Sequence, residues 1–301
     1  MRKHINKQDF KIEFAQRLKR QNTVIDKLKR KNAKGTPLIS NVTSMHDFAG
    51  CRMIFDNLDD LYEFRDYIHS SQTMRNVRHE LRDKDPAKYN YIERPKPTGY
   101  RGIHDVYRHF PRGSVRREEK KPWDGLLMEL QYRTRVQHAW ATAVEISDLL
   151  DGERTKFELD VTERGRFFAI ASEIIARQHE GMCKAFTDQS DDDLQKELEK
   201  LEKEMDILRT LKVLKQFEDG KKLQKHNVLN IYRESDDSFK LEVIPFNTAE
   251  PAIEKATELE ASEDSVNAVY VRSDNPITLR SAYRNYFYDS VDFVKMIPLI
   301  S

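Results

Sequence analysis

The sequence predicts an α+β protein, in which a mixed sheet flanked by helices is followed by a smaller C-terminal α+β unit. In the first part of the chain, compact apolar runs typical of buried strands alternate with segments of helical periodicity. A polar, acidic break follows at Thr187–Asp193, and a second, shorter set of strand and helix patterns comes after it. We therefore predict a first domain over residues 1–188, a linker helix over 189–220 and a C-terminal domain over 221–301.

Composition limits the class of protein. The chain has 301 residues, 34% of them charged, with a formal net charge of +1. No apolar run approaches the ~18 residues of a membrane span, and the basic N-terminus lacks the apolar core of a signal peptide. Cys51 and Cys183 both have apolar neighbours, which predicts two buried thiols rather than a zinc site. We expect a cytoplasmic protein without membrane contact.

The elements of the first domain follow from periodicity. Strands are predicted at Ile12–Lys19, Cys51–Phe55, Arg101–Phe110 and Leu126–Arg133. Helices are predicted at Val24–Lys31, Leu58–Ile68, Val136–Leu150 and Arg164–Phe186. The last two strands are expected to pair, with the charged loop Pro111–Pro122 between them.

The rest of the chain gives a second set of elements. Five apolar residues, Leu194, Leu198, Leu201, Met205 and Leu208, recur at helical spacing and predict an amphipathic helix. Beyond it we predict strands at Val228–Tyr232, Phe239–Phe246 and Val266–Val271, and helices at Pro251–Leu259 and around Leu279–Tyr286.

Basic residues near the N-terminus form the first candidate site. Arg17 and Lys19 share one face of a strand, Thr23 is placed as a helix N-cap, and Lys27 lies about one turn later. Transfer of a phosphoryl or pyrophosphoryl group needs cations at several oxygens, because the transition state spreads charge over the moving group. A solvated basic helix is the alternative interpretation.

A carboxylate and an arginine flank the next predicted strand. Asp47 comes just before it and Arg52 lies within it. Mg²⁺ bound to phosphates takes one or two carboxylates, so Asp47 is a candidate metal ligand. The alternative is a turn aspartate with an arginine on the strand.

The third candidate site joins two paired strands. Tyr100 follows Gly99, which permits a tight turn and close approach of a ligand, and an aromatic ring can stack on a nucleobase. Glu129, Gln131 and Arg133 share one face of their strand by period 2, and Glu129 is a candidate base and metal ligand. Packing of Tyr100 and a solvent-facing Glu129 are the alternatives.

The dipeptides His46-Asp47 and His104-Asp105 suggest a metal-dependent phosphohydrolase. Such a site also needs a separate upstream histidine and a distant aspartate. Only His4 precedes His46, and it lies in a charged terminus, so we exclude this class of site.

In combination, these segments resemble the synthetase domain of the RelA/SpoT alarmone family. The residues that carry the resemblance are Arg17-x-Lys19, Thr23, Asp47-Phe-Ala-Gly-Cys-Arg52, Tyr100-Arg-Gly-Ile-His104 and Glu129-Leu-Gln-Tyr-Arg-Thr. The resemblance implies a nucleotidyltransferase-like fold and a pyrophosphokinase that uses ATP and Mg²⁺. It assigns ATP to Arg17, Lys19, Thr23, Lys27 and Arg52, metal to Asp47 and Glu129, catalysis to Glu129 and Asp47, and the acceptor to Lys96, Tyr100, His104, Gln131 and Arg133.

The C-terminal part is similar to that of fused toxin–antitoxin members of the CapRel type. Tyr283-Arg-Asn-Tyr286 matches their Tyr-x-x-Tyr motif, which implies autoinhibition at the ATP site and a phage protein as activator. Packing of the two tyrosines in a small core is the alternative interpretation. The implied acceptor is the 3′ end of tRNA, held by basic residues that include Lys29, Arg30, Lys31, Arg116, Arg117, Lys120 and Lys121. Two alternatives stay open: an alarmone synthetase acting on GDP, GTP or adenine nucleotides, and a catalytically silent binding protein.

Overall fold

The computed structural model describes residues 1–18, 25, 28–29, 35–39, 41–47, 49–70, 79–83, 85–110, 121, 123–150, 162–208, 211, 224–233, 239–260, 262, 265–272 and 291–298. The chain divides into two compact units. The first unit holds residues 1–96 and 100–137, and the second holds residues 97–99 and 138–301. Among the helices of these described ranges, none is both long and apolar enough to cross a membrane.

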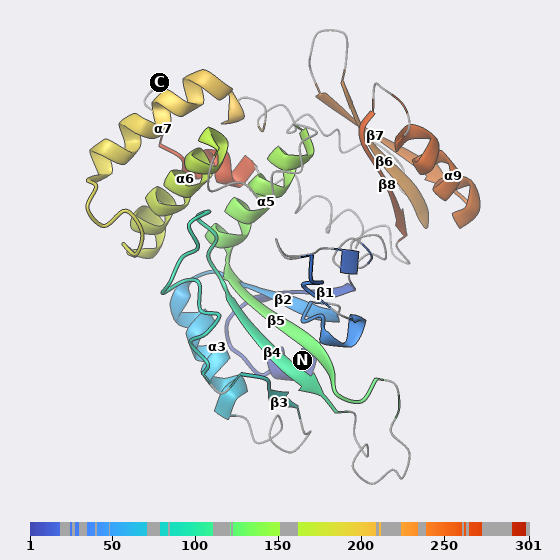
Figure 1. Cartoon of the computed structure of the whole chain (residues 1–301), viewed down its shortest axis with the longest axis horizontal. Coiled ribbons are helices and arrows are strands. Elements are labelled where there is room, and N and C mark those ends of the chain that lie inside the picture. The colour runs from blue at the N-terminus through green and yellow to red at the C-terminus, as the bar shows by residue number, and fades with distance from the viewer. Residues whose placement is uncertain are drawn as a thin grey trace. The chain divides into compact units, whose positions relative to one another are not determined.

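The first unit is built on a five-stranded mixed sheet (Figure 1). Its strands are β1 (Ile12–Leu18), β2 (Ala49–Phe55), β3 (Glu80–Leu81), β4 (Ile103–His109) and β5 (Leu126–Thr134). Their order across the sheet is β1-β2-β5-β4-β3. Strands β2 and β5 run parallel, and the other neighbours are antiparallel. The predicted mixed sheet, and the pairing of its last two predicted strands, are confirmed.

Helix α3 (Leu58–Ser70) covers the first unit's core. Its apolar residues Leu61, Phe64 and Ile68 are fully buried, as their helical spacing predicts. The ring of Phe64 lies 5.7 Å from that of Phe55 on β2. Two short helices, α1 (Arg2–Ile5) and the 3-10 helix η1 (Val42–Ser44), complete the described elements of this unit.

A buried ion-pair network ties α3 to β4. Asp105 is 2% exposed and accepts hydrogen bonds from Arg65 Nη2 at 2.8 Å and Arg65 Nε at 3.2 Å. His69 Nε2 lies 2.7 Å from Asp105 Oδ2, the oxygen that also accepts from Arg65 Nε. Burial by itself raises the pKa of Asp105, but the hydrogen bonds from His69 and Arg65 outweigh it and lower that pKa.

The second unit begins with helices α5 (Arg135–Leu150), whose first turn belongs to the first unit, α6 (Glu163–Glu180) and α7 (Asp191–Met205). Helix α6 ends earlier than the predicted Arg164–Phe186, because Gly181 adopts the left-handed conformation of a helix C-cap. Cys183 follows this end and is exposed, so the prediction of two buried thiols is wrong for Cys183 and confirmed for Cys51.

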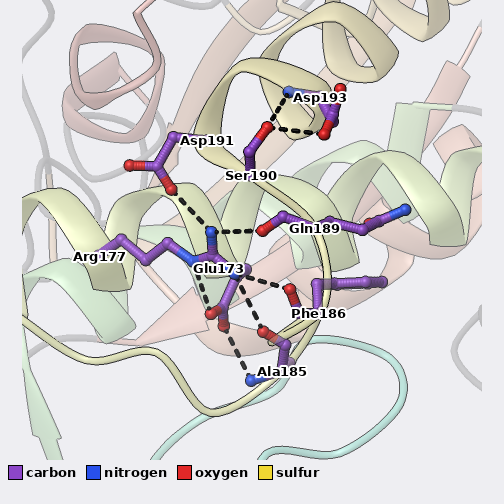
Figure 2. Close-up of polar contacts among 8 residues, drawn as sticks. All are labelled: Glu173, Arg177, Ala185, Phe186, Gln189, Ser190, Asp191 and Asp193. Carbon is purple, nitrogen blue, oxygen red and sulfur yellow. Dashed lines mark hydrogen bonds and ion pairs between the residues drawn. The ribbon is translucent and has the colours of Figure 1, made fainter.

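The corner between α6 and α7 is held by buried charges (Figure 2). Glu173 has no exposed surface, accepts a hydrogen bond from Arg177 Nε at 3.0 Å and accepts another from the Ala185 amide at 3.2 Å. Arg177 also donates to the Phe186 carbonyl at 2.8 Å and to Asp191 at 2.7 Å. These bonds tie the turn after α6 to the buried pair of Glu173 and Arg177.

Helix α7 is amphipathic, as predicted. Leu194, Leu198 and Leu201 are buried along one side, and Ser190 caps the first turn by accepting from the Asp193 amide. The helix ends at Met205, where Asp206 takes the left-handed conformation, so Leu208 is buried beyond the helix rather than in it.

The C-terminal elements form a small antiparallel sheet with one helix (Figure 1). They are β6 (His226–Arg233), β7 (Phe239–Phe246), α9 (Ala249–Glu260) and β8 (Ser265–Arg272), with strand order β7-β6-β8. Val228, Ala252, Ala256 and Ala268 form the core between sheet and helix. The predicted helix around Leu279–Tyr286 lies outside the described residues, and the predicted domain boundaries stay a prediction.

Candidate active site

Sheet register brings the candidate residues together on the central strand. In the register of β5, Glu129 lies opposite Gly50 of β2, and Gln131 lies opposite both Arg52 of β2 and His104 of β4. Alternate residues of a strand point to the same face, so Glu129, Gln131 and Arg133 share one face of β5, as predicted. Residues from three strands therefore meet around Glu129.

Gly50 allows β2 to approach the site. A Cβ atom at this position would lie 2.3 Å from the Glu129 carbonyl oxygen, a distance that real Cβ atoms do not adopt. The absence of a side chain at Gly50 is thus a packing requirement of the strand pair that carries Glu129.

Both carboxylate oxygens of Glu129 have partners. His104 Nδ1 lies 2.7 Å from Oε1, and Gln131 Nε2 donates to Oε2 at 2.6 Å. Arg52 Nε donates to Gln131 Oε1 at 3.3 Å and so extends the network to β2. These hydrogen bonds fix the orientation of the Glu129 carboxylate. The Glu129 side chain is 12% exposed, so the carboxylate remains accessible.

Tyr100 lies at the other end of the same network. Its hydroxyl is 2.5 Å from His104 Nε2 and accepts a hydrogen bond from Arg133 Nη2 at 3.0 Å. The Arg133 guanidinium carbon lies 5.1 Å from the centre of the Tyr100 ring, and the Lys96 ammonium lies 5.2 Å from it. The structure thus groups four of the predicted acceptor-binding residues, Lys96, Tyr100, His104 and Arg133.

These contacts shift the acidity of the network. Burial raises the pKa of Glu129, but the hydrogen bond and charge of His104 and the hydrogen bond from Gln131 together lower it by more, so the carboxylate stays ionised. Burial lowers the pKa of His104, but Tyr100 and Glu129 together raise it by more, so the pKa lies above its ordinary value. Burial raises the pKa of Tyr100, and Arg133 and His104 together lower it to about 8.

The loop before Tyr100 depends on Gly99. Gly99 has a φ of +83°, and a Cβ atom there would lie 2.8 Å from the Ala169 Cα of α6. Its carbonyl accepts a hydrogen bond from Ser172 Oγ at 2.6 Å. The positive φ and the closeness of α6 explain why only glycine fits at this position. The tight turn at Gly99 is the one that the sequence predicts.

Asp47 supplies a second carboxylate charge near Glu129. Its negative charge opposes the lowering of the Glu129 pKa. In the part of the chain that the structure describes, no three histidine, cysteine or acidic side chains form a ready metal cluster. Two carboxylates suffice for Mg²⁺ carried on nucleotide phosphates, because that ion keeps waters and takes its other oxygens from the phosphates.

Several predicted residues lie outside the described part. They are Lys19, Thr23, Lys27, Arg30, Lys31, Arg116, Arg117, Lys120, Tyr283 and Tyr286, and for Arg17 only the main chain in β1 is described. Lys29 is described and exposed. Their assigned roles remain predictions.

The sequence predictions missed Tyr91. Its ring lies 4.4 Å from the Lys96 ammonium and 5.8 Å from the Tyr100 ring. The sequence contains a pattern that could have identified Tyr91 as a site residue. Tyr89 and Tyr91 stand just before the basic turn that ends at Lys96.

A family model matches part of the chain. Residues 16–147 match the family model described as the region found in RelA / SpoT proteins. These residues form a RelA/SpoT region. It contains Asp47, Arg52, Tyr100, His104 and Glu129.

The relatives of the RelA/SpoT region cover only part of the chain. GTP pyrophosphokinase YwaC of Bacillus subtilis (strain 168) is 29% identical over 126 residues, which are 42% of this chain and 52% of YwaC. Probable GTP diphosphokinase RSH3, chloroplastic, of Oryza sativa subsp. japonica is 32% identical over 98 residues, which are 32% of this chain and 11% of RSH3. The chain therefore spans about half the length of one curated relative, and much less of the other.

Solved structures show similarity over a little more than half of the chain. Small alarmone synthetase 1 from Bacillus subtilis, bound to its product pppGpp, has a TM-score of 0.41 and 24% identity, covering 56% of this chain and 74% of that protein. A GTP pyrophosphokinase family protein from Streptococcus pneumoniae has a TM-score of 0.37 and 22% identity, covering 57% and 76%.

Proposed function

We propose that the protein is a RelA/SpoT-type pyrophosphokinase that transfers pyrophosphate from ATP to a ribose 3′-hydroxyl. The observation that carries this proposal is the Glu129 carboxylate, held by His104 and Gln131 within a cluster that also contains Tyr100 and two cations. An ionised, fixed carboxylate beside an aromatic ring and cations suits activation of a hydroxyl on a nucleotide.

The reaction balances with these residues. Glu129 takes the proton of the acceptor hydroxyl, whose oxygen forms a bond to the β-phosphorus of ATP. The bond between that phosphorus and the oxygen bridging to the α-phosphate breaks, and AMP leaves with the electron pair. Arg52, together with Arg17, Lys19, Thr23 and Lys27 from the sequence, binds the triphosphate and stabilises its developing charge.

Asp47 and Glu129 are the residues that would hold Mg²⁺. When bound, the ion neutralises phosphate charge and polarises the β-phosphoryl group. The same two carboxylates repel each other without a cation, which the opposing effect of Asp47 on the Glu129 pKa reflects.

For the acceptor, we propose the 3′ end of tRNA, so that the enzyme blocks translation. Basic residues at Lys29, Arg30, Lys31, Arg116 and Arg117 supply the cations that tRNA phosphates need. Free GDP, GTP or an adenine nucleotide is the second candidate. The names of YwaC, a GTP pyrophosphokinase, and of RSH3, a probable GTP diphosphokinase, favour it.

The test incubates the full chain with Mg²⁺, ATP labelled on its transferred phosphates, and either bulk tRNA or free nucleotides. Glu129→Gln is the matched control, because it keeps the shape of the side chain and removes the charge. Label in tRNA that disappears in the control supports the first acceptor, and label in a free nucleotide alone supports the second. No label in any acceptor, from a folded protein, contradicts the enzyme and favours a catalytically silent binding protein.

We further propose that the C-terminal domain inhibits the enzyme through Tyr283 and Tyr286, and that a phage protein relieves this inhibition in anti-phage defence. The support is the Tyr-x-x-Tyr motif, whose two rings project together if the segment is helical. Tyr283→Ala or Tyr286→Ala should then raise basal transfer, measured with the same labelled ATP. Unchanged transfer with unchanged thermal unfolding would remove this regulatory role.

A further inference from the structure

His104 was assigned to the acceptor from the sequence, but its geometry favours another role. An imidazole has only two nitrogens with which to make hydrogen bonds. In this structure Nδ1 lies 2.7 Å from Glu129 Oε1, and Nε2 lies 2.5 Å from the Tyr100 hydroxyl. Both nitrogens are thus engaged by the protein.

The two partners of His104 are the residues that the proposed function uses for different tasks. Tyr100 offers its ring to the acceptor base, and Glu129 takes the proton from the acceptor hydroxyl. The short contacts between them pass through one ring whose side chain is only 17% exposed. Arg133 holds the Tyr100 hydroxyl by donating to it at 3.0 Å. Gln131 holds the Glu129 carboxylate by donating to it at 2.6 Å.

We propose that His104 is a positioning residue that couples Tyr100 to Glu129, so that the orientation of the catalytic carboxylate depends on the Tyr100 hydroxyl. Seating of the acceptor on the Tyr100 ring then also sets the position of the base. This inference rests on the proposed function, and it moves His104 from the acceptor-binding residues to those that hold Glu129.

The packing around His104 supports a fixed ring. Tyr91 lies edge-on to it with ring centres 5.5 Å apart, and Tyr100 lies edge-on at 5.5 Å. The main-chain amide of His104 donates to the Tyr89 carbonyl at 3.1 Å. A ring held by its backbone and by two aromatic neighbours can transmit a displacement of one partner to the other, because packed side chains do not deform freely.

Tyr100→Phe separates this role from stacking, because it keeps the ring and removes only the hydroxyl. We expect kcat to fall by about 10- to 100-fold, since misplacing a reacting group by about 1 Å has an effect of this size. The KM for the acceptor should stay within about threefold, since the ring still binds the base. Tyr67→Phe, which removes a hydroxyl on α3 that contacts His4 and not the Glu129 network, is the matched control and should leave kcat unchanged.

A double-mutant cycle decides whether the hydroxyl acts through His104. His104→Gln should lower kcat similarly, and Tyr100→Phe combined with His104→Gln should lower it no further than either single change. If the fall in kcat of the double variant equals the product of the falls in the two single variants, the two residues act independently and the coupling is contradicted. A raised acceptor KM with unchanged kcat in His104→Gln would return His104 to direct acceptor binding and overturn the proposal.

A measurement without substrate keeps the two proposals distinguishable. In ¹⁵N NMR of the full chain labelled at histidine, the His104 signals are those lost in His104→Gln. Tyr100→Phe should shift the Nε2 signal and Glu129→Gln the Nδ1 signal, because each removes or alters the partner of that nitrogen. If no acceptor is labelled, the proposed enzyme fails while these shifts still establish the coupling, and unshifted signals overturn it.

Discussion

Adjacent residues of β4 serve opposite faces of the sheet. His104 joins the network around Glu129, while Asp105 points to α3 and forms the ion pair with Arg65. The two side chains alternate because successive residues of a strand point to opposite faces. A change at Asp105 therefore tests the stability of the sheet without removing a polar contact of the candidate site.

Asp105→Asn should destabilise the fold strongly at neutral pH. It leaves the buried Arg65 guanidinium without its anion, and loss of one member of a buried pair costs about 3–5 kcal/mol. The free energy of unfolding, from urea denaturation at pH 7, measures this effect. Asp83→Asn, at an exposed pair with Lys88, is the control and should change little.

The same substitution predicts a pH dependence with a definite sign. The pKa of Asp105 is lower in the folded protein than its ordinary value, so the carboxylate stabilises the fold above the unfolded pKa of about 3.9. This contribution is lost as the pH falls through the folded pKa. The difference between wild type and Asp105→Asn should therefore shrink below about pH 4. A difference that does not shrink as the pH falls below about 4 would contradict an ionised Asp105.

At the scale of elements, the stability of the corner between α6 and α7 depends on one buried carboxylate, that of Glu173. Glu173→Gln keeps the shape of the side chain but removes the charge that faces Arg177 (Figure 2). We expect a loss of about 3–5 kcal/mol in the free energy of unfolding, because Arg177 loses the charge of its buried partner. Urea denaturation of the full chain measures it.

Glu204→Gln provides the comparison on α7. Glu204 pairs with Lys200 on the exposed side of that helix, with 45% and 75% of the two side chains exposed. Exposed pairs of this kind contribute at most about 1 kcal/mol, so the variant should unfold near the wild-type denaturant concentration. Equal effects of Glu173→Gln and Glu204→Gln would show that burial at the corner is unimportant.

Periodicity predicts the elements better than their ends. The alternation in β5 placed Glu129, Gln131 and Arg133 on one face, and the helical spacing in α3 found its buried side. The end of α6 was placed too late, because the apolar residues after Gly181 continue the composition of a helix while the left-handed Gly181 stops it. A cap depends on a single backbone conformation, which periodicity does not contain.

In the candidate site, too, the sequence predicts some features and not others. Local patterns selected Glu129, from its face of the strand, and Tyr100, from the glycine before it, while His104 was selected by the resemblance to the RelA/SpoT family. They did not show that His104 has both nitrogens engaged, since this depends on the register between β4 and β5. Register joins residues far apart in the chain, so the sequence pattern of one strand cannot specify it.

At the scale of the whole molecule, the net charge is too small to attract a polyanion. The formal charge of +1 means that no general positive field surrounds the protein. Affinity for tRNA, if tRNA is the acceptor, must then come from local groups such as Lys29, Arg30, Lys31, Arg116 and Arg117. A free nucleotide would need no such surface.

Salt dependence separates the two acceptors. For tRNA, the logarithm of the binding constant should fall linearly with the logarithm of salt concentration, and each lost phosphate contact should reduce the slope by roughly one. Arg116→Glu and Arg117→Glu should therefore weaken tRNA binding and flatten the slope, measured by titration over a range of salt concentrations. Lys255→Glu on α9, a basic residue outside this set, should leave the slope unchanged. If both arginine variants bind tRNA with the wild-type slope, this loop does not hold tRNA phosphates, and a free-nucleotide acceptor becomes the better explanation of the site around Tyr100.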